Sequence, residues 1–330
     1  MSLLFLATTH RVAPGLLSWR AWETLRSASR VLAAEDNPQL PYVREAGVRV
    51  EVTVPDAQEL VTAAAERVPP AAGAGPVVWL ASPDGDEELM RAVGELVVAA
   101  DEPVELEVLH GSYDLPGARL LDLVSVMDTL RRECPWDRKQ THASLAPYLL
   151  EEAYEVLDAI EGGDLSALRE ELGDVLLQVA FHSVVAAERS DETAFAIDDV
   201  AAAIVDKLVR RHPHVFGTVT VDGADQVIAN WEDIKAAERA AKNGGEPSVF
   251  DGVPMGQPAL SLAAQLQRRA ARAAAPQELY AAGRGLAAEL FALVRRAGDE
   301  GLDPESELRG AAREFRDRVE SWVRDEDPPA

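Results

Sequence analysis

Residues 146–179 read APYLLEEAYEVLDAIEGGDLSALREELGDVLLQV, and this stretch decides the fold. Apolar residues recur at three- and four-residue intervals on both sides of the Gly162-Gly163 pair, as they do in amphipathic helices. The first helix starts near Ala146 and ends near Ile160, before the two glycines, and Asp164 is a suitable N-cap for the second. Because the connection is short, the sequence predicts a tight helical hairpin.

Two more helices and an α/β segment complete the predicted fold. After the hairpin, one helix runs from about Ile197 to the His212-Pro213 break, and another contains residues 231–242. Residues 1–117 instead alternate helix-like pieces with short apolar runs, at residues 3–7, 48–54, 77–80 and 103–109. We therefore predict a mainly α protein, an all-α four-helix bundle preceded by a small α/β N-terminal domain.

Composition excludes several classes of protein. With 330 residues, of which 47% are hydrophobic and 27% charged, the chain has enough apolar material for two or three packed units. The single Cys134 excludes an intrachain disulfide, and there is no basic-led signal segment or apolar run of about 18 residues. A net charge of −25 argues against a nucleic-acid polymer as partner. We expect a cytoplasmic protein without a membrane span.

Five carboxylates stand on the predicted hairpin. On the first helix, Glu151 and Glu152 precede Glu155 by four and three residues, so three acids crowd one patch. On the second helix, Glu171 and Asp174 repeat the three-residue spacing. Like charges at this spacing destabilise a helix by roughly 0.2–0.5 kcal/mol per pair unless a cation intervenes. Mg²⁺ or Mn²⁺ prefers such oxygen ligands, so one interpretation is a metal site. The simpler interpretation is that these acids form a solvated helix face.

Two further pairs of residues at helical spacing follow the acids. Lys207 and Arg211 either face the bundle beside a site or extend to water from the helix end. Trp231 and Lys235 offer an aromatic face and an ammonium group to a nucleotide, or they are a core anchor and an exposed lysine. The residues alone leave a non-catalytic interaction protein open as an alternative. A di-iron bundle is disfavoured because neither acidic helix supplies a Glu-x-x-His pair.

Six motifs occur in a fixed order along the middle of the chain: CPWD at 134–137, QTH at 140–142, YLLEEAYEV at 148–156, EELGD at 170–174, KLVRRHPHVF at 207–216 and WEDIK at 231–235. Together they closely resemble the MazG family of nucleoside triphosphate pyrophosphohydrolases, over about residues 121–256. The resemblance implies an α-helical homodimer that cleaves the α–β phosphate bond of nucleoside triphosphates, releasing a monophosphate and pyrophosphate. A narrow dUTP- or dCTP-type pyrophosphatase of the same bundle type is the alternative within enzymes.

The resemblance also implies a role for each candidate residue. It assigns Mg²⁺ ligation to Glu152, Glu155, Glu171 and Asp174, help in orienting or deprotonating water to Glu151, phosphate binding to Lys207 and Arg211, and nucleotide contact to Trp231 and Lys235.

Three domains follow from these patterns. Residues 118–256 form the predicted catalytic domain, and residues 257–330 resemble a degenerate second copy of it. The second copy reads Gly285-Leu286-Ala287-Ala288 where the first has Glu171-Leu172-Gly173-Asp174, so it is expected to be structural. Residues 1–117 resemble a truncated tetrapyrrole methylase without its glycine-rich cofactor loops.

Overall fold

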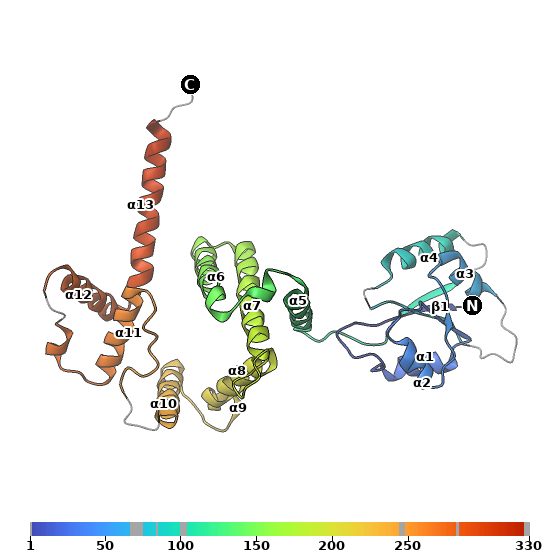
Figure 1. Cartoon of the computed structure of the whole chain (residues 1–330), viewed down its shortest axis with the longest axis horizontal. Coiled ribbons are helices and arrows are strands. Elements are labelled where there is room, and N and C mark those ends of the chain that lie inside the picture. Colours follow the sequence, from blue (N-terminus) through green and yellow to red (C-terminus); the bar gives the residue numbers. More distant parts are fainter. Residues whose placement is uncertain are drawn as a thin grey trace. The chain divides into compact units, whose positions relative to one another are not determined.

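A computed structural model describes residues 2–66, 75–83, 85–99, 104–243, 248–281 and 284–326. The described chain is mostly helical, with one small parallel sheet near its N-terminus (Figure 1). This confirms the predicted mainly α class that begins with an α/β segment. The chain divides into two compact units, residues 1–201 and 202–330. Among the described residues, no helix combines the length and the apolar character that a membrane span requires.

The sheet has five parallel strands in the order β3-β2-β4-β1-β5. Their bounds are β1 Ser2–Ala7, β2 Arg30–Ala33, β3 Glu51–Val52, β4 Val77–Leu80 and β5 Glu105–His110. The apolar runs predicted β1, β3, β4 and β5, although β3 is shorter than its run and Pro103 lies outside the described residues. Strand β2 was not predicted, because its four residues follow a helix with no glycine or proline to mark the boundary.

Helices cover both faces of the sheet (Figure 1). Helices α1 (Trp19–Ser27) and α2 (Leu40–Glu45) pack with Leu4 and Leu6 of β1. Helices α3 (Ala57–Ala65) and α4 (Glu87–Ala99) pack with Leu3 and Phe5, which point to the opposite face. Burial on both faces explains why β4 is apolar throughout and fully buried.

The predicted hairpin is formed by α6 (His142–Gly162) and α7 (Leu165–Ala187), which lie side by side. Its turn follows the sequence signals, since Gly163 has a left-handed φ of 69° and the Asp164 carboxylate caps α7. Helix α6 begins one turn before the predicted start near Ala146. The reason is a capping box in which Thr141 and Ser144 bond each other's backbone amides.

Little apolar surface of the hairpin is covered within its own unit. Helix α5 (Arg119–Glu133) and the short 3-10 helix η1 (Asp137–Lys139) precede the hairpin, and α5 packs on α7. The small core at this contact consists of Met127, Leu145, Ala180 and Phe181. Other apolar residues that form the predicted stripes of α6 and α7 are exposed, including Ile160 at 54%, Leu165 at 78% and Leu172 at 48%.

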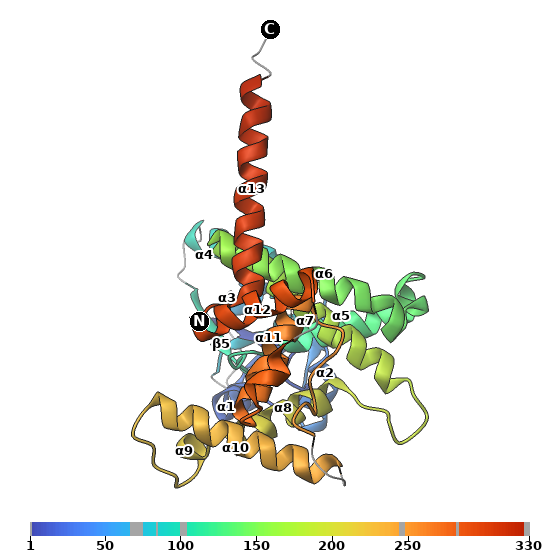
Figure 2. The ribbon, with the colours of Figure 1, turned by 90° about the vertical axis from the view of Figure 1, so that its left-hand side faces the viewer.

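The remaining helices agree with the expected breaks. Helix α8 (Ile197–Arg211) ends before α9 (Pro213–Phe216), as predicted, and α10 (Ala224–Asn243) begins earlier than its predicted core. The predicted second copy contains α11 (Ala259–Arg272), the 3-10 helix η2 (Gln277–Tyr280), α12 (Leu286–Asp299) and α13 (Pro304–Glu326). Helix α13 is one long uninterrupted rod in both views (Figures 1 and 2). The domain limits at 117/118 and 256/257 stay predictions.

Candidate functional site

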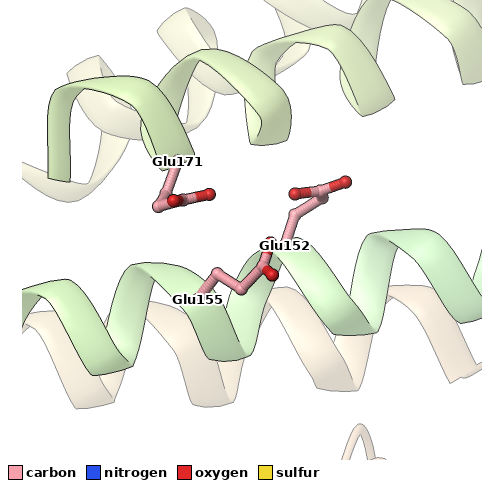
Figure 3. Close-up of side chains that lie close together, drawn as sticks. All are labelled: Glu152, Glu155 and Glu171. Atoms are coloured by element: carbon pink, nitrogen blue, oxygen red, sulfur yellow. The ribbon is translucent and has the colours of Figure 1, made fainter. Parts of the chain in front are cut away.

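Three carboxylates meet between the two helices of the hairpin. Glu152 and Glu155 project from α6, and Glu171 projects from α7 toward them (Figure 3). In the described part of the chain, each offers one oxygen, and these oxygens lie within 4.8 Å of one another. The three-residue spacing on α6 and the tight turn at Gly163 bring these side chains together.

The other two predicted acids flank this group. Asp174 lies on α7 and is half-buried, and its charge acts on both Glu152 and Glu171. Glu151 is exposed on α6, and its charge acts on Glu152. All five predicted acids therefore belong to one continuous acidic region of the hairpin, although only three form the close group.

Crowding makes the ionised carboxylates unfavourable. Burial raises the pKa of Glu152, and a hydrogen bond with Glu155 and the charge of Asp174 raise it further. Burial also raises the pKa of Glu171, followed by the charges of Glu155 and Asp174. A cation between these groups would remove the repulsion and favour the ionised forms.

The donor set fits a hard divalent cation. Every donor in the close group is a carboxylate oxygen, which suits Mg²⁺ or Mn²⁺ better than thiophilic metals. Oxygens on one Mg²⁺ ion, each bound at about 2.0–2.1 Å, lie roughly 3 to 4 Å apart. The 4.8 Å limit of this group is close to that value, so small side-chain rotations suffice to bring the oxygens onto one ion.

The predicted cationic and aromatic residues follow the acidic hairpin in sequence, on α8 and α10. The half-buried Trp231 ring on α10 has the Lys235 ammonium 4.4 Å from its centroid. The guanidinium carbon of Arg211, at the end of α8, lies 5.9 Å from the same ring. Both distances are within the range of cation–π attraction. Lys207 lies exposed on α8. The structure thus groups Arg211, Trp231 and Lys235.

Glu238, the acid that bonds Arg211, was not predicted from the sequence. The Glu238 carboxylate on α10 accepts hydrogen bonds from both Arg210 and Arg211. Glu238 follows Trp231 by seven residues and Lys235 by three, so the helical period could have placed it on their face. In a chain with 57 acidic residues, that spacing alone did not distinguish it.

A second missed feature is a histidine pair at the start of the hairpin. Nδ1 of His142 and Nδ1 of His182 lie 2.8 Å apart, with ring centroids 5.1 Å apart and an interplanar angle of 1°. One nitrogen must donate and the other must accept without a proton. Burial lowers the pKa of His182, and the neighbouring His142 lowers it further.

We expect this pair to make the fold sensitive to acid. Because the folded-state pKa of His182 is below its ordinary 6.5, the unfolded chain binds the proton more readily, and stability falls as pH drops below 6.5. Thermal unfolding between pH 7.5 and 5.5 measures this fall. His182→Asn should reduce it, whereas His110→Asn, on β5, should leave it unchanged. An equal fall in both variants would refute the assignment.

Comparisons with known proteins identify the family of the chain. Residues 140–216 match the MazG nucleotide pyrophosphohydrolase domain. The chain is 49% identical over 242 residues to an uncharacterised 26.1 kDa protein of Streptomyces cacaoi, spanning 73% of this chain and 98% of that protein. It is 39% identical to a nucleoside triphosphate pyrophosphohydrolase of Mycolicibacterium smegmatis, over 84% of this chain and 76% of that protein. It is 40% identical to the nucleoside triphosphate pyrophosphohydrolase/pyrophosphatase MazG of Thermotoga maritima, over 60% of this chain and 82% of that protein.

Proposed function

The chain belongs to the MazG family of nucleotide pyrophosphohydrolases, and we propose that it hydrolyses nucleoside triphosphates to a monophosphate and pyrophosphate. The observation that carries this proposal is the meeting of Glu152, Glu155 and Glu171 between α6 and α7. The pKa values of Glu152 and Glu171 are raised, so keeping these crowded carboxylates ionised costs free energy unless a cation is bound. A cation also attaches phosphate oxygens to an acidic protein.

Mg²⁺, or Mn²⁺, is the proposed cofactor. Glu152, Glu155 and Glu171 hold it, and Asp174 joins them from the next turn of α7. When bound, the metal neutralises phosphate charge and lowers the pKa of a water molecule. Exposed Glu151 is placed at the edge of this region, where a carboxylate can orient that water or accept its proton.

The residues of α8 and α10 bind the rest of the substrate in this proposal. Lys207 and Arg211 neutralise phosphate oxygens, for which a guanidinium offers two parallel donors. Trp231 and Lys235 contact the nucleotide. Their cation–π contact supports the assignment, since it keeps the ammonium against the indole ring and not free in solvent.

Product analysis with a triphosphate labelled at the α-phosphate tests the function. Labelled monophosphate with pyrophosphate is the expected result in the presence of Mg²⁺. Labelled diphosphate with inorganic phosphate would refute cleavage at the α–β bond. A panel of purine and pyrimidine triphosphates then separates broad turnover from turnover confined to dUTP or dCTP.

We further propose that the hairpin completes a four-helix bundle in a homodimer. The support is the uncovered apolar stripe of α6 and α7, on which Leu165 and Leu172 are 78% and 48% exposed. A second copy supplies the matching surface, since its hairpin carries the same stripe. Light scattering should give twice the chain mass of 35.6 kDa, and a monomer at micromolar concentration would contradict the proposal.

The predicted domain roles are part of the same proposal. Residues 118–256 carry the catalytic acids. Residues 257–330 have a supporting and not a catalytic role, because α12 begins with Leu286, Ala287 and Ala288 and not with paired acids. Residues 1–117 remain assigned to a truncated methylase-like domain without a catalytic part in hydrolysis.

A further inference from the structure

Glu238 joins the end of α8 to α10 through three hydrogen bonds. Its Oε2 atom accepts from Nε and Nη2 of Arg211 at 3.2 and 2.6 Å. Its Oε1 atom accepts from Nε of Arg210 at 2.7 Å. The side chains of Glu238 and Arg211 are only 19% and 14% exposed, whereas that of Arg210 is 55% exposed. Arg211 is therefore the partner that Glu238 holds inside the structure.

The same face of α10 surrounds Arg211 with fixed groups. Trp231, Lys235 and Glu238 are spaced four and three residues apart on this helix. The guanidinium carbon lies 5.9 Å from the centroid of the Trp231 ring, and Glu238 accepts hydrogen bonds from the same guanidinium. Hydrogen bonds from Arg211 and then Arg210 lower the pKa of Glu238 to about 2, so it is ionised at neutral pH.

This contact leaves a defined part of Arg211 for a ligand. A guanidinium has five N–H donors, and Glu238 uses one on Nε and one on Nη2. The remaining donors are both hydrogens of Nη1 and one of Nη2. One hydrogen of Nη1 and the remaining hydrogen of Nη2 point in parallel from the Nη1–Nη2 edge, which matches two phosphate oxygens.

We propose that Glu238 is a positioning residue that orients the Nη1–Nη2 edge of Arg211 toward the substrate phosphates. The proposal rests on the proposed function, in which Arg211 binds phosphate. Glu238 itself does not touch the substrate, since its two oxygens are occupied by Arg210 and Arg211.

Two opposite effects follow from removing the Glu238 charge. The anionic substrate gains from a more positive surface, by about two- to fivefold in affinity for one surface charge in high dielectric. It loses because a freed arginine must be ordered on binding, and this corresponds to roughly ten- to thirtyfold in affinity. The ordering effect is the larger, so we expect weaker binding.

Kinetics of Glu238→Gln test this in the full chain, with Mg²⁺ and the triphosphate that is turned over fastest. We expect KM to rise about five- to tenfold while kcat changes by less than about threefold. Glu238→Asp, which keeps the charge, should recover part of the loss. Asp225→Asn, an exposed charge in the first turn of α10, is the matched control and should leave KM unchanged.

A double-mutant cycle with Arg211→Ala separates positioning from a general structural role. If Glu238 acts through Arg211, adding Glu238→Gln to Arg211→Ala raises KM no further. The proposal would be overturned if the increases in KM of the two single variants multiply in the double variant. A lower KM for Glu238→Gln alone would also overturn it. If no triphosphate is hydrolysed by the wild-type chain, the proposed function fails. The same cycle measured by calorimetric binding of magnesium pyrophosphate then decides the role of Glu238.

Discussion

Glu155→Gln is expected to lower pyrophosphate release by roughly 10²- to 10³-fold without unfolding the chain. Glu155 is central in the acidic group, because it raises the pKa of both Glu152 and Glu171. A neutral amide at this position removes one charged ligand from the proposed metal. A loss of about 3–4 kcal/mol of transition-state stabilisation corresponds to this rate change.

Stability should respond to Glu155→Gln in the opposite direction. Without metal, the substitution removes like-charge repulsion, so the melting temperature in chelator should stay equal or rise. With Mg²⁺, the wild type should gain several degrees and the variant should gain less, because a ligand that binds the folded chain more weakly stabilises it less.

A matched control isolates the acidic group. Glu133→Gln removes an exposed carboxylate from α5 and leaves the three grouped acids intact, so it should retain activity and the Mg²⁺ response. Undiminished pyrophosphate release by Glu155→Gln would exclude the assignment of the site, whatever the chain hydrolyses.

Local signals in the sequence were sufficient to predict the hairpin. Two glycines followed by Asp164 define a helix end and a helix start by backbone chemistry alone, and both are present in the structure. Strand β2 and the true start of α6 were missed for the same type of reason. Neither is marked by glycine or proline, and β2 is a strand because it pairs with β3 and β4, which are distant in sequence.

The candidate site was predictable where it depends on one helix or one tight turn. The i,i+3 spacing and the short connection together imply that Glu152, Glu155 and Glu171 meet. The contact of Glu238 with Arg211 joins residues 27 apart on different helices, and the pair His142 and His182 lies 40 apart. No periodicity within one helix predicts such contacts, so only the packed structure could identify them.

Removal of divalent metal is expected to abolish hydrolysis, by at least about 10³-fold, and to lower the melting temperature of the wild-type chain. The acids of α6 and α7 then face one another without a counter-charge, and no cation connects them to phosphate. Treatment with a chelator, followed by dialysis and a coupled assay of pyrophosphate, measures the first effect. Thermal unfolding of the same samples measures the second.

Restoring metals one at a time distinguishes the acidic group from a nonspecific salt effect. Mg²⁺ and Mn²⁺ should restore both turnover and thermal stability at millimolar concentration. Ca²⁺ takes six to eight oxygens at about 2.3–2.6 Å, so it should restore stability but little turnover. Sodium chloride at matched ionic strength screens exposed charges and should restore neither fully. Full activity in chelator would show that these carboxylates do not act through a metal, and the proposed catalytic role of Glu152, Glu155 and Glu171 would fall with it.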